Sequence, residues 1–393
     1  MTQTPWSMVE YAESFLKATT GADNHFIIRP QWSYNYAIVG DFVGFYKSLL
    51  ASCPWVPIAS WESKLPLTSA EAVFSISFPR LERMNCLSHV NWGHELGHIL
   101  ANRWILNNFP ALWQKEEAAI RAAVEGEVNQ NPPQHLHPLF KDTIIKQIVS
   151  QQTQHAMEIL RQGLTELICD AIGVHLFGPA ILAECCEYAA VHSMDESPLS
   201  IGAYPPWRFR IRKLYEACRD QLNPRTVHTD AGDQAYPGPT LAPYVGWLRE
   251  VASVVSVHSD EQALHAHVIT RETYRLIGSK WSDVRKEVLA LLPAEYQEPY
   301  DLAQKGPDLE QLVQKLGMDM PPNEYGNWPA TTPASLQDIL NAGWAFKIGK
   351  MRTAPGWGGR EDEGKMLRLL LKAIEASFVT QKYGEKLKKA VDG

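Results

Sequence analysis

Apolar residues recur every three to four positions over much of this 393-residue chain, which is the spacing that gives a helix one apolar face. Segments with this pattern cover residues 6–18, 88–108 and 112–128, a stretch from Asp142 through Glu166, and much of residues 245–378. Residues 73–78 alternate instead between apolar and small polar side chains, as a half-buried strand does, and residues 26–38 favour short strands. The pattern predicts a mainly α-helical protein with a small β-sheet.

Residues 94–98, His-Glu-Leu-Gly-His, carry the candidate chemistry of the chain. On a helix, His94 and His98 lie one turn apart on the same face, so both imidazoles can reach one metal ion. Glu95 then sits beside them, where its carboxylate can polarise a water held by the metal. Neither proline nor a turn dipeptide interrupts residues 88–108, so we expect the motif to lie on a helix, as this chemistry requires.

Two glycines lie on the same predicted helix, Gly93 directly before His94 and Gly97 directly before His98. Each lowers helix propensity by about 1 kcal/mol relative to alanine. Such a cost makes sense where another backbone or a substrate must approach the helix closely.

A zinc site needs a third protein ligand, and Glu166 is the best candidate. It lies in an otherwise apolar helical segment, and Asp170 follows one turn later on the same face. Two carboxylates on a face made for burial are costly unless they face a cation or a paired group. Glu166 would bind the metal, and Asp170 would accept the free ring N–H of His94 or His98. The structural alternative is a buried salt bridge to an arginine.

Residues 204–212, Tyr-Pro-Pro-Trp-Arg-Phe-Arg-Ile-Arg, predict a further helix with proline near its first turn. Attack on a carbonyl creates an oxyanion that needs a donor from the protein, and Tyr204, Arg208 and Arg210 are candidates for that role. In the structural alternative, the arginine side chain pairs with Asp170 or with carbonyls at a helix C-terminus.

The order of these motifs resembles the gluzincin metallopeptidases, and most of all the branch that includes the CaaX prenyl protease. That branch carries H-E-x-x-H, then E-x-x-x-D on a later helix, then His-Pro followed by Arg-Ile. Here His94, Glu95 and His98 match the first motif, Glu166 and Asp170 the second, and Arg210 with Ile211 the end of the third, with Tyr204 in place of the usual histidine. The resemblance spans about residues 70–215 and implies a zincin-like fold and one Zn²⁺ ion.

Charge and composition limit the kinds of partner. The net charge is −7 with acidic and basic residues interspersed, so the sequence has no electrostatic footprint for nucleic acid or an anionic membrane. Charged residues and a Gly-Pro pair interrupt the most apolar stretch, 167–191, so no membrane span is expected, and membrane substrates are not carried over from the family. Neither a signal peptide nor a C-x-x-C pair is apparent, which favours reduced thiols and a cytoplasmic protein.

Three regions follow from these patterns. Residues 1–222 are predicted to form the zincin-like catalytic domain, and residues 223–243, rich in Pro, Gly, Asp and Thr, a linker or long loop. Residues 244–393 are predicted to be a helical accessory region that could recruit a protein partner. The strand at 73–78 invites pairing of an extended peptide with an exposed edge, with an interior strand as the alternative.

The favoured function is a zinc-dependent peptidase that acts on a peptide or protein substrate, with Glu95 as general base and Tyr204 as a catalytic donor. One alternative is a non-catalytic binding or regulatory protein built on a zincin scaffold. Another is a metal-dependent amidase or deformylase acting on small molecules. Deformylases use a cysteine as third ligand, and Cys86 invites that comparison, although it lies only eight residues before His94.

Overall fold

The computed structural model describes residues 6–21, 25–31, 36–39, 73–79, 84–132, 138–190, 204–229, 232–256, 268–326, 331–359 and 361–392. The helices are α1 (Trp6–Thr20), α4 (Asn91–Gln130), α5 (Lys141–Phe177), α6 (Ala180–Ala190), α7 (Trp207–Cys218), α8 (Ala242–Ser256), α10 (Val268–Leu289), α11 (Gly306–Gly317), α12 (Leu336–Gly349) and α13 (Asp362–Asp392). The strands are β1 (His25–Gln31), β2 (Ala37–Val39), β3 (Val73–Pro79), β4 (Arg225–Thr229), β5 (Gly232–Tyr236), β6 (Glu324–Tyr325) and β7 (Thr332–Pro333). The predicted class, mainly α with a small sheet, is confirmed.

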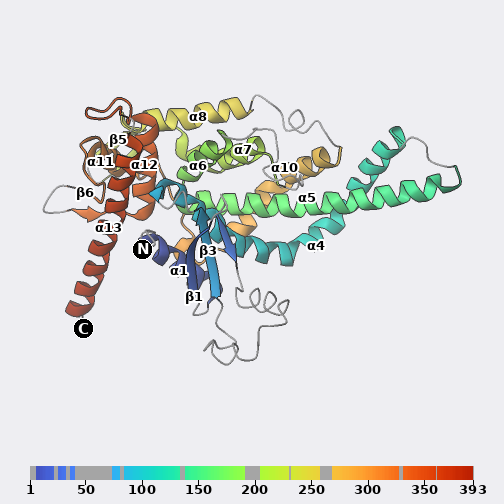
Figure 1. Ribbon diagram of the computed structural model, residues 1–393, viewed down its shortest axis with the longest axis horizontal. Coiled ribbons are helices and arrows are strands. Elements are labelled where there is room, and N and C mark those ends of the chain that lie inside the picture. The colour runs from blue at the N-terminus through green and yellow to red at the C-terminus, as the bar shows by residue number, and fades with distance from the viewer. Residues whose placement is uncertain are drawn as a thin grey trace.

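Helices α4 and α5 form the long axis of the molecule. They lie side by side, and their connected ends project beyond the other elements, away from α13 at the opposite end (Figure 1). The segments predicted at 91–108 and 112–128 form one 40-residue helix, α4, with Pro110 inside it, whereas residues 88–90, also predicted as helix, end the 3₁₀ helix Cys86–Val90 before it. Proline has no N–H to donate to the preceding turn, and α4 bends along its length (Figure 1).

Glycines let α4 and α5 approach each other closely. A Cβ atom on Gly97 would lie 2.8 Å from Cα of Cys169, and one on Gly93 would lie 3.1 Å from Cα of Gly173. Side chains longer than hydrogen would push the two helices apart at these points. The expected close approach of another backbone is therefore confirmed, and it brings the His94–His98 face of α4 against α5.

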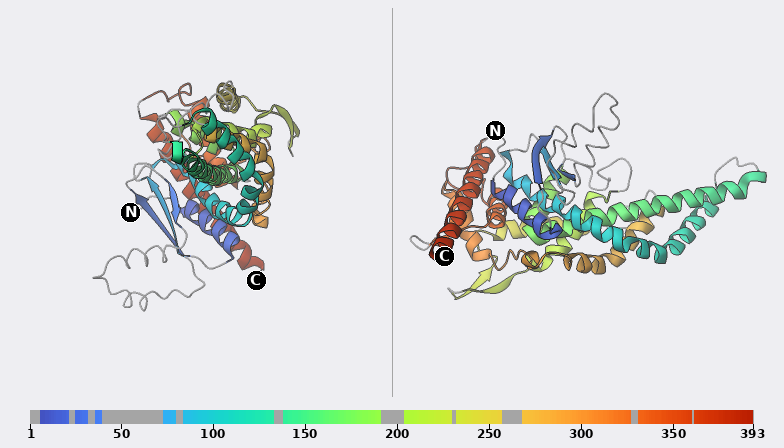
Figure 2. Two further views of the ribbon diagram at one scale, coloured as in Figure 1. Left: turned by 90° about the vertical axis from the view of Figure 1, so that its right-hand side faces the viewer. Right: turned by 90° about the horizontal axis from the view of Figure 1, so that it is seen from below.

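The three-stranded sheet has the order β1-β3-β2, with β1 parallel and β2 antiparallel to β3. It lies on one side of the helical body, next to α1 and α4 (Figure 2). Because β3 is the central strand, the interior alternative is confirmed and an exposed edge at residues 73–78 is wrong. Residues 74–78 are all buried, so β3 is covered on both faces rather than half-buried.

The C-terminal helices pack on the same core as the N-terminal ones. Buried apolar side chains form one cluster that extends from Met8 in α1 to Ile374 in α13. The Trp104 Nε1–H group of α4 donates to Glu287 Oε2 of α10 at 3.0 Å, and Lys280 Nζ of α10 lies 2.8 Å from Glu116 Oε1 of α4. The division into residues 1–222 and 244–393 stays a prediction.

Two further findings bear on the predicted organisation. Residues 223–243 contain the antiparallel hairpin β4–β5, so part of the predicted linker or loop is regular structure. Among the described residues, no helix is both long enough and apolar enough to cross a membrane.

Candidate metal centre

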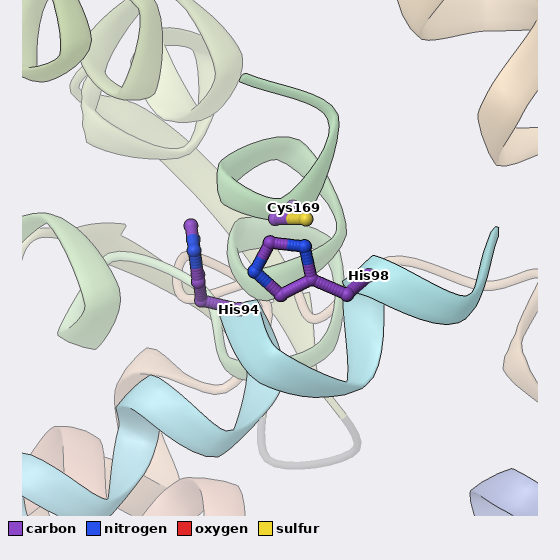
Figure 3. Close-up of side chains that lie close together, drawn as sticks. All are labelled: His94, His98 and Cys169. Atoms are coloured by element: carbon purple, nitrogen blue, oxygen red, sulfur yellow. The ribbon is translucent and has the colours of Figure 1, made fainter. Parts of the chain in front are cut away.

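His94 and His98 project from one face of α4 toward α5, where Cys169 faces them (Figure 3). The ring centroids of the two histidines are 5.1 Å apart, and the ring planes meet at 87°. One nitrogen of each ring and the sulfur of Cys169 all lie within 4.8 Å of one another. Within the described part of the chain, this group of side chains can hold a metal ion.

Glu166 approaches the same point from α5. Its Oε2 lies 3.3 Å from Nε2 of His94, and its side chain is only 6% exposed. Two ligand atoms of a tetrahedral zinc ion with bonds of about 2.0–2.1 Å lie about 3.3 Å apart. A charge-assisted N–H···O bond is shorter, about 2.7–2.9 Å. The separation matches the spacing of two zinc ligands and is longer than a typical charge-assisted hydrogen bond. Glu166 is not one of the three donors that lie within 4.8 Å of one another, so it meets the centre through His94. Imidazole, thiolate and carboxylate are the donor types that zinc binds, so these residues fit that ion.

Asp170 holds the other side of the His94 ring. Asp170 Oδ1 lies 2.8 Å from His94 Nδ1, the contact expected of a carboxylate that orients a metal-binding histidine. Arg210 on α7 donates to the same carboxylate, from Nε to Oδ2 at 2.9 Å and from Nη2 to Oδ1 at 2.7 Å. The nearest approach of Arg210 to Glu166 is 3.9 Å. Arg210 thus forms the buried salt bridge with Asp170 that the sequence analysis gives as the alternative to a metal site.

The charges of the centre favour a cation between the two helices. Burial opposes protonation of His94, but hydrogen bonds and charges from Asp170 and Glu166 raise the pKa of its imidazole to about 10. Burial works against ionisation of Asp170 too, and the Arg210 charge nonetheless lowers the pKa of that carboxyl group well below its usual range. In the metal-free protein, a proton on His94 supplies the positive charge that a metal ion would bring, and metal binding would displace it.

Glu95 is buried on the β2 side of the centre. The backbone N–H of Ile38 in β2 donates to Glu95 Oε2 at 3.2 Å, and the same oxygen lies 3.9 Å from His98 Nε2. Burial raises the pKa of Glu95 to about 7 in the metal-free protein. Burial, with the charge of His94, lowers the pKa of His98 to about 4, so His98 is neutral at pH 7 and free to act as a ligand.

Tyr204 lies near these acidic groups, just before α7. Its side chain is half-buried, and burial with the charges of Glu166 and Glu95 raises the pKa of its phenol to about 12. The hydroxyl therefore keeps its proton at neutral pH and can donate a hydrogen bond. Arg208 is a partly exposed residue of α7, and its role stays a prediction.

Two parts of this centre are not singled out by the sequence analysis. Cys169 lies between Glu166 and Asp170, three residues after the first, so helical spacing alone places it near the same face. Among the described residues, the group whose ligand atoms lie within 4.8 Å of one another contains Cys169 in the place predicted for Glu166, which lies 3.3 Å from His94 but is not in the group. Cys86 is not in the group either, and it lies in the short 3₁₀ helix Cys86–Val90 before α4. The hydrogen bond from Ile38 N–H to Glu95 depends on how the sheet packs against α4. No spacing of residues in the sequence predicts it.

No family model matches this chain, and neither a curated protein nor a solved structure was found to match it. The resemblance to the gluzincins therefore rests on the motifs alone, and the function has to be argued from the geometry of the centre.

Proposed function

We propose that the protein is a zinc-dependent peptidase with a zincin-like catalytic centre. The observation that carries the proposal is the 3.3 Å approach of Glu166 Oε2 to His94 Nε2, across two helices that meet at a glycine contact. It supports a ligand set of His94, His98 and Glu166, with Asp170 orienting the His94 ring.

When bound, a zinc ion supplies Lewis-acid chemistry: it lowers the pKa of water and polarises a carbonyl group. The protein supplies the proton transfers. Glu95, whose pKa of about 7 in the metal-free protein suits a general base near neutral pH, takes a proton from the attacking water and returns it to the leaving amine. The Ile38 N–H holds the Glu95 carboxylate beside the histidines, so this group needs little reorganisation for the transfer.

Tyr204 is the donor we assign to the developing oxyanion. Its hydroxyl is protonated at neutral pH, and its side chain is close enough to Glu166 and Glu95 for their charges to affect it. Arg210 is less suited to this role, because its Nε and Nη2 groups already donate to Asp170 as a two-point ion pair. We assign Arg210 to positioning.

The test separates metal binding from catalysis. In Glu95→Gln the side chain keeps an oxygen that can accept from Ile38 N–H, so we expect the variant to bind about one zinc ion and to lose about 10²- to 10⁴-fold in activity. His98→Ala should lose both zinc and activity. His155→Ala, which removes an exposed histidine of α5, is the matched control and should change neither.

Zinc content is measured by elemental analysis, and activity by cleavage of unfolded casein with and without a chelator. A zinc-loaded Glu95→Gln protein that cleaves at the wild-type rate would remove the general-base role. Zinc binding without any chelator-sensitive cleavage would favour the non-catalytic alternative.

A further inference from the structure

The donors around the centre outnumber those that an open zinc site needs. On α4, His94 and His98 are four residues apart, and on α5, Glu166 and Cys169 are three residues apart. Both spacings put the two side chains of a pair on one helix face. Because these faces meet at the helix crossing, ligand atoms of His94, His98 and Cys169 lie within 4.8 Å of one another, and Glu166 Oε2 lies 3.3 Å from His94 Nε2. A catalytic zinc centre uses three protein ligands, so these four side chains exceed that number by one.

We propose that Cys169 is a fourth ligand, whose thiolate closes the metal centre in the resting protein. This inference rests on the proposed function, because it assumes that His94, His98 and Glu166 hold the metal. It also changes what the resting protein can do, because a four-coordinate centre with only protein ligands has no position for water or substrate.

The helix crossing leaves Cys169 little freedom to lie elsewhere. A Cβ on Gly97 would be 2.8 Å from Cα of Cys169 and 3.3 Å from its Cβ, so the backbone of Cys169 lies directly against the turn of α4 that separates the two histidines. Figure 3 shows the Cys169 side chain beside the ring of His98. A short side chain at this position remains close to the centre.

The distances are near those of a zinc–thiolate site. Bonds of about 2.3 Å to sulfur and about 2.1 Å to nitrogen place the two ligand atoms about 3.6 Å apart in a tetrahedron. The sulfur and the histidine nitrogens already lie within 4.8 Å of one another. A shift of about 1 Å in side-chain position, within reach of ordinary rotamer adjustment, would complete the fourth bond.

Exposure distinguishes the two sides of the centre. Cys169 is 0% exposed, whereas the His98 side chain is 23% exposed. Sulfur therefore approaches the metal from the protein interior, and substrate would approach from the side of His98. Cys169 would release its thiol proton to solvent on binding a metal as the thiolate, and it would take a proton back on leaving the metal, which would open one coordination position. No oxidant or reductant takes part in this exchange.

Spectroscopy on the full-length protein tests the proposal without relying on activity. X-ray absorption of the zinc form should show one sulfur at about 2.3 Å beside nitrogen and oxygen at about 2.0–2.1 Å. After exchange of zinc for Co²⁺, the protein should show a near-ultraviolet thiolate-to-cobalt charge-transfer band. Both signals should disappear in Cys169→Ala and Cys169→Ser and persist in Cys185→Ala, which removes another buried thiol, from α6.

Added azide reports whether a position is open. We expect azide to leave the visible spectrum of the wild-type cobalt protein unchanged and to shift that of Cys169→Ala. A wild-type protein with one zinc ion and only nitrogen and oxygen ligands would overturn the proposal and leave the proposed function standing. A sulfur signal that survives both Cys169 substitutions would also overturn it. A wild-type protein that binds no zinc would remove the proposed function as well.

Discussion

Asp170 makes two contacts that the sequence predicts as alternatives. One is the hydrogen bond to His94 Nδ1 at 2.8 Å, and the other is the two-point ion pair with Arg210. The two are compatible because a carboxylate can accept from several donors at once. Since Arg210 keeps Asp170 ionised, the His94 ring is held with Nε2 facing Glu166. The sequence presents the Arg210–Asp170 ion pair as an alternative to a metal-supporting role for Asp170. In the structure, the same ion pair helps Asp170 to orient His94.

His89 predicts a pH dependence of stability that is separate from the metal centre. It is fully buried among Tyr36, Phe78 and Trp92, and its Nδ1 lies 3.3 Å from the Tyr36 hydroxyl. Burial lowers the pKa of His89 from 6.5 to about 4. Between these pH values the unfolded chain binds the proton and the folded protein does not, so the free energy of unfolding falls as pH drops, by about 3 kcal/mol in total.

Urea unfolding of metal-free protein at pH 7 and pH 4.5 measures this effect. His89→Phe and His89→Gln cannot take up the proton, so each should lose less stability than the wild type over this interval. Equal losses in the wild type and both variants would contradict the burial of a neutral imidazole at this position.

At the scale of single elements, apolar spacing predicts the positions of α1 and β3 and most of α5, because each follows one local pattern. It does not predict that β3 is the central strand and is buried on both faces. It divides α4 into two segments, because Pro110 is locally a helix breaker although the packed helix tolerates it. The sequence predicts that His94 and His98 lie close together, because both are on one face of one helix. It does not predict the position of Cys169 beside them, because that position depends on how closely α4 and α5 cross.

That crossing gives the second prediction. A Cβ on Gly97 would lie 2.8 Å from Cα of Cys169, and backbone atoms cannot move aside as a flexible side chain can. We expect Gly97→Ala to lower the free energy of unfolding by about 1–3 kcal/mol, despite the better helix propensity of alanine, and to weaken zinc binding because the α4 and α5 ligands separate.

Gly126→Ala is the matched control for this substitution. Gly126 lies on the same helix, and nothing is within 4 Å of where its Cβ would be. Here alanine should raise the free energy of unfolding by about 1 kcal/mol and leave zinc affinity unchanged. Chemical denaturation and competition with a zinc chelator measure the two quantities. Similar changes at Gly97 and Gly126 would mean that the helices do not touch at Gly97.

At the scale of the whole molecule, the C-terminal half completes the end of the helix that carries Glu166. The last carbonyl groups of a helix lack partners within it. For α5, Tyr300 N donates to His175 O at 2.9 Å, and Asn341 Nδ2 of α12 donates to Phe177 O at 2.8 Å. Gly178 then turns the chain at φ 65°, where a Cβ would meet the Tyr300 ring. The region predicted to be accessory therefore supplies partners to the C-terminal end of α5, the helix that carries Glu166.

A chain that ends at residue 243 tests this role against the predicted domain division. Truncation removes α10 from α4 and both donors from the end of α5, so we expect residues 1–243 to unfold without a cooperative transition and to bind zinc poorly. In the full chain, Asn341→Ala should cost about 1–3 kcal/mol of stability, because it leaves a buried carbonyl without its donor. Circular dichroism during heating and zinc titration measure both effects. If residues 1–243 unfold cooperatively and bind zinc as the full chain does, the N-terminal region folds independently of α10 and α12, in agreement with the predicted division at residue 222.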